Sequence, residues 1–551
     1  MAKEAVAKTA EQLGKEQRAI SVAEFFEKNR HLLGFDNPTK ALLTVVKEAV
    51  DNSLDACEEA HILPDIKVII KTVEENVFRV TVEDNGPGIV KQQIPHIFAR
   101  LLYGSKFGRG KQGRGQQGIG ISAAVLYAQL TTGKGTLILS KPAKDKPTHK
   151  MELKLDTTKN EPKVLHEEDL KDGPLKHTGT SITLEIQGKY IQSKHSVDEY
   201  MRQTAIMNPH ANIHYENPPG EKFNWKRSIE KMPKLPTEIK PHPHGVEMGI
   251  LERMAHATAS RTIASFLQND FCRVGSTSAE EICRLAGLDS GASARTLTGD
   301  QIKKLYESIQ KVKLMRPPTD CLAPIGTKMF EEGLRTEFKP EFVRAITRDP
   351  VVYRGNPFQI EAAIAYGGSL ALTQSGEVAS EDAVQQPVKL IRYANKMPLL
   401  YEQSSCALTK AVQGIKWKRY GLEQSGGGLP SGPASIIVHI CSTWVPYTSE
   451  GKEAIASYPE IIEEVKLAIQ ECARDLMRYV SHKARGELAE KKREIFRKYS
   501  MELAVSIHAI TGEDKEKLQA KLLKIAEKMY KQQGGDEIEE EKPAPAHNEE
   551  E

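Results

Sequence analysis

The sequence predicts an α+β protein of several domains, with helices layered over β-sheets. A helix is expected from Pro38 to about Ala60, because Asn37 is a favourable N-cap and Pro38 suits the first helical position. The alternating runs "KVIIKTV" and "VFRVTVED", separated by "EEN", come next and predict two paired strands. Pro-rich stretches interrupt the chain at two later points, and each predicts a domain boundary.

Further elements of the first layer are expected on both sides of that helix and hairpin. Ser21 and Glu24 form a capping-box pattern, which predicts a short helix over "SVAEFFEKNRHLL". Helices are also predicted for "QQIPHIFARLLY" and "ISAAVLYAQLTT", and a strand for "GTSITLEI". These elements extend the layer of helices over a sheet.

The segment between the two Pro-rich junctions is expected to be a compact helical module. It lies between "NPPGEKFNWKRSIEKMPKLPTEIKPHPHG" and "PPTDCLAPIG" and covers residues 246–315. Two capping-box patterns, Ser278 with Glu281 and Thr298 with Gln301, each predict the start of a helix. Several short helices are therefore expected here.

Strands return in the last third of the chain. They are predicted between about 340 and 445, with a helix near "SSCALTKAVQGI". Residues 459–533 predict a nearly continuous helix that is broken at Thr511–Gly512. The acidic, Pro-containing segment that follows predicts disorder.

The composition is that of a water-soluble globular protein and favours a cytoplasmic location. Of 551 residues, 27% are charged and 39% hydrophobic, and no apolar run approaches the roughly 20 residues of a membrane span. The seven cysteines are scattered, which predicts reduced thiols. Residues 536–551 hold eight acidic residues and one lysine, so the rest of the chain has 76 basic and 66 acidic residues, a net charge of +10. Such a surplus is compatible with a polyanionic partner.

One face of the predicted helix at 38–60 is unusually acidic. Glu48, Asp51, Asn52 and Asp55 are spaced i, i+3, i+4 and i+7, so at about 100° per residue they share one side of the helix. Like charges so close together repel one another unless water or a cation relieves them. The stripe is therefore either a solvated face or the wall of a metal site.

A glycine-rich loop, "SKFGRGKQGRGQQGIGIS", spans residues 105–122 and leads into an apolar helix. Glycines let backbone N–H groups approach phosphate oxygens, and the following helix adds its dipole. The basic side chains of Lys106, Arg109, Lys111 and Arg114 add positive charge. The loop is neither a Walker A motif nor a Rossmann fingerprint, so a flexible surface loop and a phosphate-binding loop both remain open.

Two short motifs complete the pattern. "DNGPG" at 84–88 follows a strand, where Asp84 could accept a hydrogen bond from a base amino group, although alone it is only a turn. "TGT" at 178–180 precedes another strand. Each motif alone is weak evidence for a binding site. Their order along the chain is more specific than either motif.

ExxxN on a helix, then DxGxG, a glycine loop and Gly-Thr, together resemble the ATP-binding domain of the GHKL family over roughly residues 20–190. That family includes gyrase, MutL, heat-shock chaperones and sensor histidine kinases. The resemblance implies a GHKL (Bergerat) α/β sandwich that binds ATP and Mg²⁺. It implies that Glu48 is the general base for water, that Asn52 binds Mg²⁺, and that Asp84 binds the adenine amino group, with Thr180 nearby.

The amino-acid sequence of longer stretches narrows the resemblance to the B subunits of type IIB topoisomerases, the topoisomerase VI family. It covers nearly the whole chain to about 480, through "EAVDNSLDA", "VEDNGPGI", "FARLLYGSKF", "RYANKMPLLY", "WKRYG" and "VPYTSEGKEAIA". The implied domains are an N-terminal strap (1–20), the GHKL ATPase domain (21–228), a helix–two-turns–helix domain (229–320), a transducer with a βαβ-type, ribosomal S5-like fold and a long helix (321–485), C-terminal helices (486–533) and a disordered acidic tail (534–551).

The same resemblance assigns the residues around the phosphates. The implied phosphate-binding residues are Ser105, Lys106, Gly115, Gln116, Gln117, Gly118, Ile119, Gly120, Ile121 and Ser122. Lys452 is the expected lysine that reaches the γ-phosphate and acts with Glu48 in catalysis. Lys396, Lys416 and Lys418 remain alternatives for that role.

The implied function is that of an ATP-hydrolysing B subunit that relaxes and decatenates duplex DNA. Its partners would be a DNA-cleaving A subunit in an A₂B₂ heterotetramer, double-stranded DNA, and a second B subunit in an ATP-dependent dimer, in an archaeal cytoplasm beside the nucleoid. A MutL-like or chaperone-like ATP clamp without topoisomerase activity is the alternative.

Overall fold

The computed structural model divides into two compact units, Met1–Leu476 and Met477–Glu551. It describes residues 9–17, 19–105, 110–115, 118–371, 386–449 and 451–532. Most of the predicted strap at 1–20 is described, and α1 (Ala10–Glu16) lies within it. The predicted acidic tail at 534–551 lies outside the described residues.

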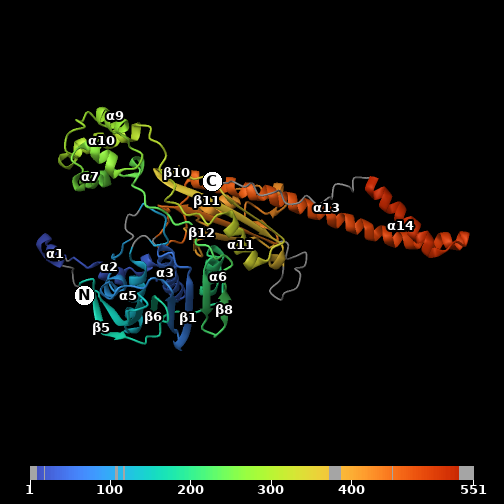
Figure 1. Cartoon of the computed structure of the whole chain (residues 1–551), viewed down its shortest axis with the longest axis horizontal. Coiled ribbons are helices and arrows are strands. Elements are labelled where there is room, and N and C mark those ends of the chain that lie inside the picture. The colour runs from blue at the N-terminus through green and yellow to red at the C-terminus, as the bar shows by residue number, and fades with distance from the viewer. Residues whose placement is uncertain are drawn as a thin grey trace, which may run out of the picture. The chain divides into compact units, whose positions relative to one another are not determined.

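An eight-stranded sheet is the centre of the first part of the chain (Figure 1). Its order is β5-β4-β3-β6-β2-β1-β7-β8, and neighbours are antiparallel except for the parallel pair β1–β7. The strands are β1 (Asp65–Glu74), β2 (Val77–Asp84), β3 (Thr136–Lys141), β4 (Thr148–Asp156), β5 (Glu161–Leu170), β6 (Gly179–Gln187), β7 (Asn212–Glu216) and β8 (Lys222–Trp225). The predicted hairpin and the predicted strand at "GTSITLEI" are confirmed.

Helices α3 (Pro38–Glu59), α5 (Gly120–Thr132) and α6 (Val197–Met207) pack with this sheet or with one another. The Asn37 side chain accepts a hydrogen bond from the Lys40 amide at 2.8 Å, so the predicted N-cap of α3 is confirmed. The apolar side of α3 enters the core with the inward side chains of β1 and β2. Helix α2 (Val22–Lys28) begins after Ser21, as predicted.

The predicted helix over "QQIPHIFARLLY" is wrong at its C-terminal end, because α4 (Ile94–Phe98) stops at Phe98. The Asn160 side chain accepts a hydrogen bond from the Leu101 amide and donates one to the Leu101 carbonyl. Leu102 has a positive φ of 58°. The distant asparagine therefore takes the backbone groups that another helical turn would use.

The helical module has its own apolar core. It contains α7 (Met248–Ala257), α8 (Ile263–Asp270), α9 (Ser276–Ala286) and α10 (Gly299–Lys311). The capping box of Thr298 and Gln301 is confirmed. The capping prediction at Ser278 is wrong, because α9 already begins at Ser276 with Gly275 as N-cap. A capping box between Thr262 and Ser265 escaped prediction, since serine stands where the pattern has Glu or Gln.

A second sheet forms the last third of the first unit. Its order is β10-β11-β16-β12-β13, and β9 also pairs with β11. The strands are β9 (Phe342–Thr347), β10 (Val351–Tyr353), β11 (Asn356–Tyr366), β12 (Lys389–Ala394), β13 (Met397–Pro398) and β16 (Ala434–Ser442). The helices α11 (Thr327–Phe338) and α12 (Ala407–Gln413) accompany them, and the predicted strands and helix are confirmed.

The C-terminal helices are α13 (Pro459–Thr511) and α14 (Lys515–Gln532). They are separated at Gly512, which has a φ of +73°, so the predicted break is confirmed. In the part of the chain that the structure describes, no helix is both long enough and apolar enough to cross a membrane.

Candidate functional site

A cavity of about 510 Å³ opens beside the acidic face of α3. It is lined from α3, the end of β2, the glycine loop with the start of α5, the start of β6, and the segment after β16. The predicted site residues that line it are Glu48, Asn52, Asp84, Ser105, Gly115, Gly118, Ile119, Gly120, Ile121, Thr180 and Lys452. Residues from five separate parts of the sequence therefore meet at one site.

Four of the predicted phosphate contacts are not placed in the cavity wall. Lys106, Gln116 and Gln117 lie outside the described residues. Ser122 is buried in the first turn of α5, and its hydroxyl donates to the Ile119 carbonyl at 2.9 Å. In this arrangement the Ser122 side chain bonds to the backbone of its own helix turn.

Glu48 and Asn52 lie one helical turn apart on α3, and both line the cavity. Among the described residues neither side chain has a hydrogen-bond or ion-pair partner, so both are available to a ligand. Gly120, the first residue of α5, lies directly against the Glu48 carboxylate, and a Cβ atom there would overlap it. The N-terminus of α5 therefore approaches this carboxylate at a distance only glycine permits.

The acidic stripe predicted on α3 is divided between two environments. Asp51 is buried and accepts a hydrogen bond from the Tyr200 hydroxyl at 3.0 Å. Burial raises the pKa of Asp51 to about 6. Asp55 is also buried and forms an ion pair with Arg114 at 2.8 Å. The four residues therefore do not form one metal cluster, and only Glu48 and Asn52 face the cavity.

Asp84 is fixed at the end of β2 by three hydrogen bonds. Its Oδ1 accepts from the amides of Gly86 (2.9 Å) and Thr180 (3.2 Å), and its Oδ2 accepts from the Ser53 hydroxyl (3.0 Å). Burial raises its pKa to about 6. Gly179 has a φ of +151°, and a Cβ there would overlap the Asp84 carbonyl oxygen. Glycine at 179 thus lets β6 bring the Thr180 amide to the carboxylate.

Lys452 enters the cavity from the segment between β16 and α13. Its ammonium group donates to the Arg114 carbonyl at 3.1 Å, and its backbone has a φ of +54°. Two lysines of α3 hold the neighbouring residues: Lys47 donates to the Gly451 carbonyl at 3.4 Å, and Lys40 forms an ion pair with Glu453. The Lys452 segment is therefore attached to the helix that bears Glu48.

The alternative lysines do not line this cavity. Lys396 is buried, with its ammonium group 3.9 Å from Glu58. Lys418 lies at the surface, 3.4 Å from Glu423. The geometry thus favours Lys452 for contact with a ligand in the cavity, over Lys396, Lys416 and Lys418.

The expectation that Lys111 and Arg114 add positive charge toward phosphate is not met by their side chains. Lys111 forms an ion pair with Glu59 at 3.2 Å. The Arg114 guanidinium is buried against Asp55 and Glu58 and points into a different pocket. The partners of Arg114 lie more than 50 residues away in the sequence, so the composition of the loop could not predict them.

The fold and the cavity define a GHKL-type ATPase domain joined to a transducer. The family model "Histidine kinase-, DNA gyrase B-, and HSP90-like ATPase" matches residues 37–187, and the model "Topoisomerase VI B subunit, transducer" matches residues 317–492. An ATPase domain of this type binds ATP.

Curated relatives agree with both matches. The chain is 49% identical over 496 residues to the type 2 DNA topoisomerase 6 B subunit of Methanococcoides burtonii, covering 90% of this chain and 78% of the relative. It is 38% identical over 580 residues to the protein of the same name from Pyrococcus furiosus, covering 96% and 98%. The chain belongs to the family of type 2 DNA topoisomerase 6 B subunits.

Proposed function

We propose that this chain is the ATP-operated gate of a type IIB topoisomerase, and that the cavity beside α3 is where ATP is bound and hydrolysed. The observation that carries the proposal is the meeting of Glu48, Asn52, Asp84 and Lys452 around one cavity of about 510 Å³. Each of these side chains has a chemistry that suits a different part of a nucleoside triphosphate.

Asp84 is suited to the adenine ring. Its carboxylate is held at the cavity wall by amide and hydroxyl donors, and an ionised carboxylate accepts further hydrogen bonds from an exocyclic amino group. Thr180 lines the same wall. At the other end, the backbone from Gly118 to Ile121 meets the N-terminus of α5, where N–H groups and the helix dipole favour phosphate oxygens.

Asn52 and Glu48 divide the metal and base chemistry. The donor set at this point of the cavity is an amide oxygen beside a carboxylate, and hard oxygen ligands of this kind suit Mg²⁺. Mg²⁺ bound there would neutralise charge on the phosphates. Glu48, one turn before Asn52, takes the proton of the attacking water, because a carboxylate that faces the cavity without a partner among the described residues can accept that proton.

Lys452 couples the nucleotide to the transducer. Its ammonium group lies in the cavity although its backbone belongs to the segment between β16 and α13. A contact between this ammonium and the γ-phosphate stabilises one arrangement of the segment for as long as that phosphate is present. Cleavage of the phosphate removes the contact and releases the transducer.

The proposed partners follow from this role. They are a DNA-cleaving A subunit in an A₂B₂ assembly, duplex DNA, and a second copy of this chain in an ATP-dependent dimer that the N-terminal segment helps to close. The proposed location is the cytoplasm. The helical module at 246–315 and helices α13 and α14 would contact DNA or the A subunit.

The test is a relaxation assay with the full chain, a purified A subunit of this family and supercoiled plasmid. Relaxation is expected only when both chains, ATP and Mg²⁺ are present. ATP hydrolysis and ATP-dependent dimerisation without any relaxation would overturn the topoisomerase role and favour the clamp alternative. Absence of adenine-nucleotide binding in the presence of Mg²⁺ would overturn the proposal as a whole.

A further inference from the structure

We infer that Arg114 is a positioning residue for Lys452: its buried guanidinium fixes the backbone carbonyl to which the Lys452 ammonium donates, and so sets how Lys452 reaches into the cavity. The inference rests on the role proposed above for Lys452. It assigns a function to a side chain of the glycine loop that points away from the nucleotide site.

Four hydrogen bonds hold the Arg114 guanidinium in place. One terminal nitrogen donates to Asp55 (2.8 Å) and Glu58 (3.0 Å), and the other donates to Glu58 (2.8 Å) and Asn208 (2.7 Å). The side chain is only 3% exposed. A guanidinium forked onto a carboxylate in this way has a fixed orientation, because two parallel bonds set both its position and its plane.

The carbonyl of the same residue receives the Lys452 hydrogen bond at 3.1 Å, and the next residue, Gly115, lines the cavity. The guanidinium therefore anchors the chain at the point where the glycine loop and the lysine segment meet. Rotation of the 114–115 peptide would move the carbonyl away from Lys452. The fixed guanidinium opposes such rotation.

The anchor also reaches the transducer through the hairpin turn between β12 and β13. Asn395 in this turn donates to the Gly113 carbonyl at 3.1 Å, and the Lys396 ammonium lies 3.9 Å from the same Glu58 that Arg114 binds. Both turn residues have positive φ values, 47° and 67°. The turn therefore touches the loop on one side of Arg114 and its carboxylate partner on the other.

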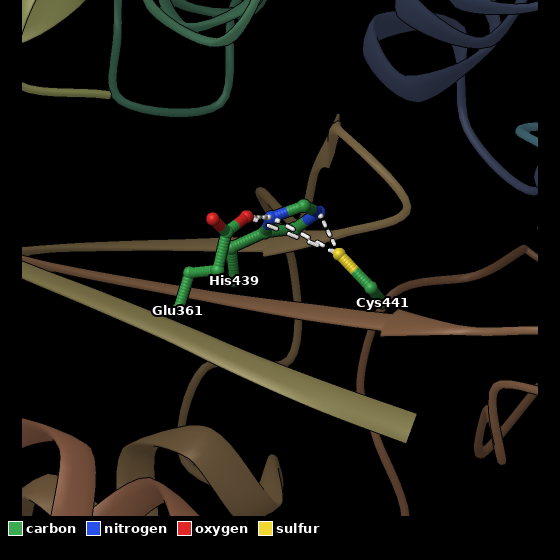
Figure 2. A group of neighbouring side chains, drawn as sticks. All are labelled: Glu361, His439 and Cys441. Atoms are coloured by element: carbon green, nitrogen blue, oxygen red, sulfur yellow. Dashed lines mark hydrogen bonds and ion pairs between the residues drawn. The ribbon is translucent and has the colours of Figure 1, made fainter. Parts of the chain in front are cut away.

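The turn contacts a buried group of three side chains, Glu361, His439 and Cys441, on the paired strands β11 and β16 (Figure 2). His439 donates from Nδ1 to Glu361 at 2.8 Å and accepts at Nε2 from the Lys396 amide at 2.9 Å. With both ring nitrogens engaged, the histidine has none to offer a metal ion. It instead holds the backbone of the turn that contacts Glu58.

Glu361 continues this framework to α11. Its carboxylate accepts hydrogen bonds from the amides of Ile325 and Gly326, immediately before that helix, each at 2.8 Å. It also accepts from the Thr347 hydroxyl. Hydrogen-bonded side chains thus connect the loop at Arg114 with the centre of the transducer sheet. Removing one partner from such a buried network is costly, because it leaves the other polar group unpaired. The network therefore favours one arrangement of the glycine loop relative to the transducer sheet.

A double-mutant cycle separates positioning from a merely structural role. Arg114→Lys keeps the charge that Asp55 and Glu58 need but loses the fork. It is combined with Lys452→Ala, and steady-state ATP hydrolysis and binding of a fluorescent ATP analogue are measured for the full chain. With Lys452 present, Arg114→Lys is expected to lower turnover about tenfold, as for one lost charge-assisted hydrogen bond, and to change nucleotide affinity less. In the Lys452→Ala background the same change is expected to alter turnover less than about twofold.

Two further variants keep the result interpretable. Lys111→Ala removes one positive charge from the same loop at a half-exposed ion pair with Glu59, and is expected to leave turnover unchanged. If Arg114→Lys lowers the unfolding temperature so far that it cannot be assayed, Asn208→Ala removes a neutral partner of the guanidinium. It is expected to give a smaller, about threefold loss, again dependent on Lys452.

Equal losses of turnover with Lys452 present and in the Lys452→Ala background would overturn the positioning role while leaving the proposed function intact. Wild-type turnover in Lys452→Ala alone would instead overturn the proposed role of that lysine. The two failures are therefore distinguished within one set of proteins.

Discussion

Gly120→Ala tests the Glu48 assignment without altering Glu48. A Cβ atom at position 120 would overlap the Glu48 Oε2 atom and would still lie only 3.0 Å from Cγ. Ordinary carbon–carbon contacts are about 3.5–4.0 Å, so the carboxylate has to move by more than about 1 Å. A displacement of that size at a reacting group costs about 100-fold in rate, within the range of about 10²–10⁴ that a general base contributes. We expect turnover to fall about 100-fold.

The stability of the protein should not fall with the activity. The displaced group is the flexible end of a side chain, and alanine favours a helix over glycine by up to about 1 kcal/mol. Nucleotide affinity should change much less than turnover, because Glu48 acts on water. The assay is steady-state ATP hydrolysis beside nucleotide binding and thermal unfolding.

Gly299→Ala is the matched control. Gly299 is the first residue of α10, as Gly120 is the first residue of α5, but a Cβ there has no neighbour within 4 Å. It is expected to hydrolyse ATP like the wild type. Turnover of Gly120→Ala within about twofold of wild type would refute the reasoning, since the carboxylate position would then be irrelevant to the rate.

Three more outcomes follow from the same cavity. Glu48→Gln should retain nucleotide binding but lose about 10²–10⁴ in turnover; near-normal hydrolysis would exclude a general base. Asn52→Ala should lower affinity for the nucleotide with Mg²⁺ by at least about tenfold and leave the affinity measured in EDTA unchanged; equal losses in both conditions would exclude metal binding. Because burial raises the pKa of Asp84 to about 6, affinity should rise about tenfold from pH 5 to pH 7 as the carboxylate ionises. Asp84→Asn should abolish this rise, apart from any due to the nucleotide itself, whereas Asp51→Asn, whose pKa is also about 6 but which lies outside the cavity wall, should keep it.

The sequence was sufficient wherever the relevant residues are close together in the chain. The N-cap at Asn37, the hairpin after α3 and the break at Gly512 depend on neighbours within a few residues, and each is confirmed. The order of the motifs also predicted that Glu48, Asn52, Asp84 and Thr180 lie around one site, and these four residues line the cavity. Order and residue type were informative because the spacing of Glu48 and Asn52 on one helix and the glycines of the loop are both local features of the sequence.

The sequence was insufficient where a distant partner decides the outcome. Asn160 ends α4 by binding Leu101, 59 positions earlier in the chain, and no local pattern marks it. Arg114 resembled a phosphate-binding residue because its loop is basic, yet Asn208 and Glu58 draw its side chain to the opposite side. Residue type predicts the strength of such an interaction, but only the packing of segments far apart in the sequence determines its direction.

The acidic helix α3 shows how the two kinds of information combine. Its polar residues form two adjacent rows with different surroundings: Glu48 and Asn52 line the cavity, whereas Asp51, Asp55 and Glu58 are buried beneath it. The spacing in the sequence placed Glu48, Asp51, Asn52 and Asp55 on one side of the helix. It could not show that one row faces the cavity and the other faces protein. Because both rows belong to one rigid helix, a shift of the buried row relative to its partners would also move the proposed base and metal ligand. The chemistry of the cavity and its connection to the transducer therefore depend on the same 22-residue element.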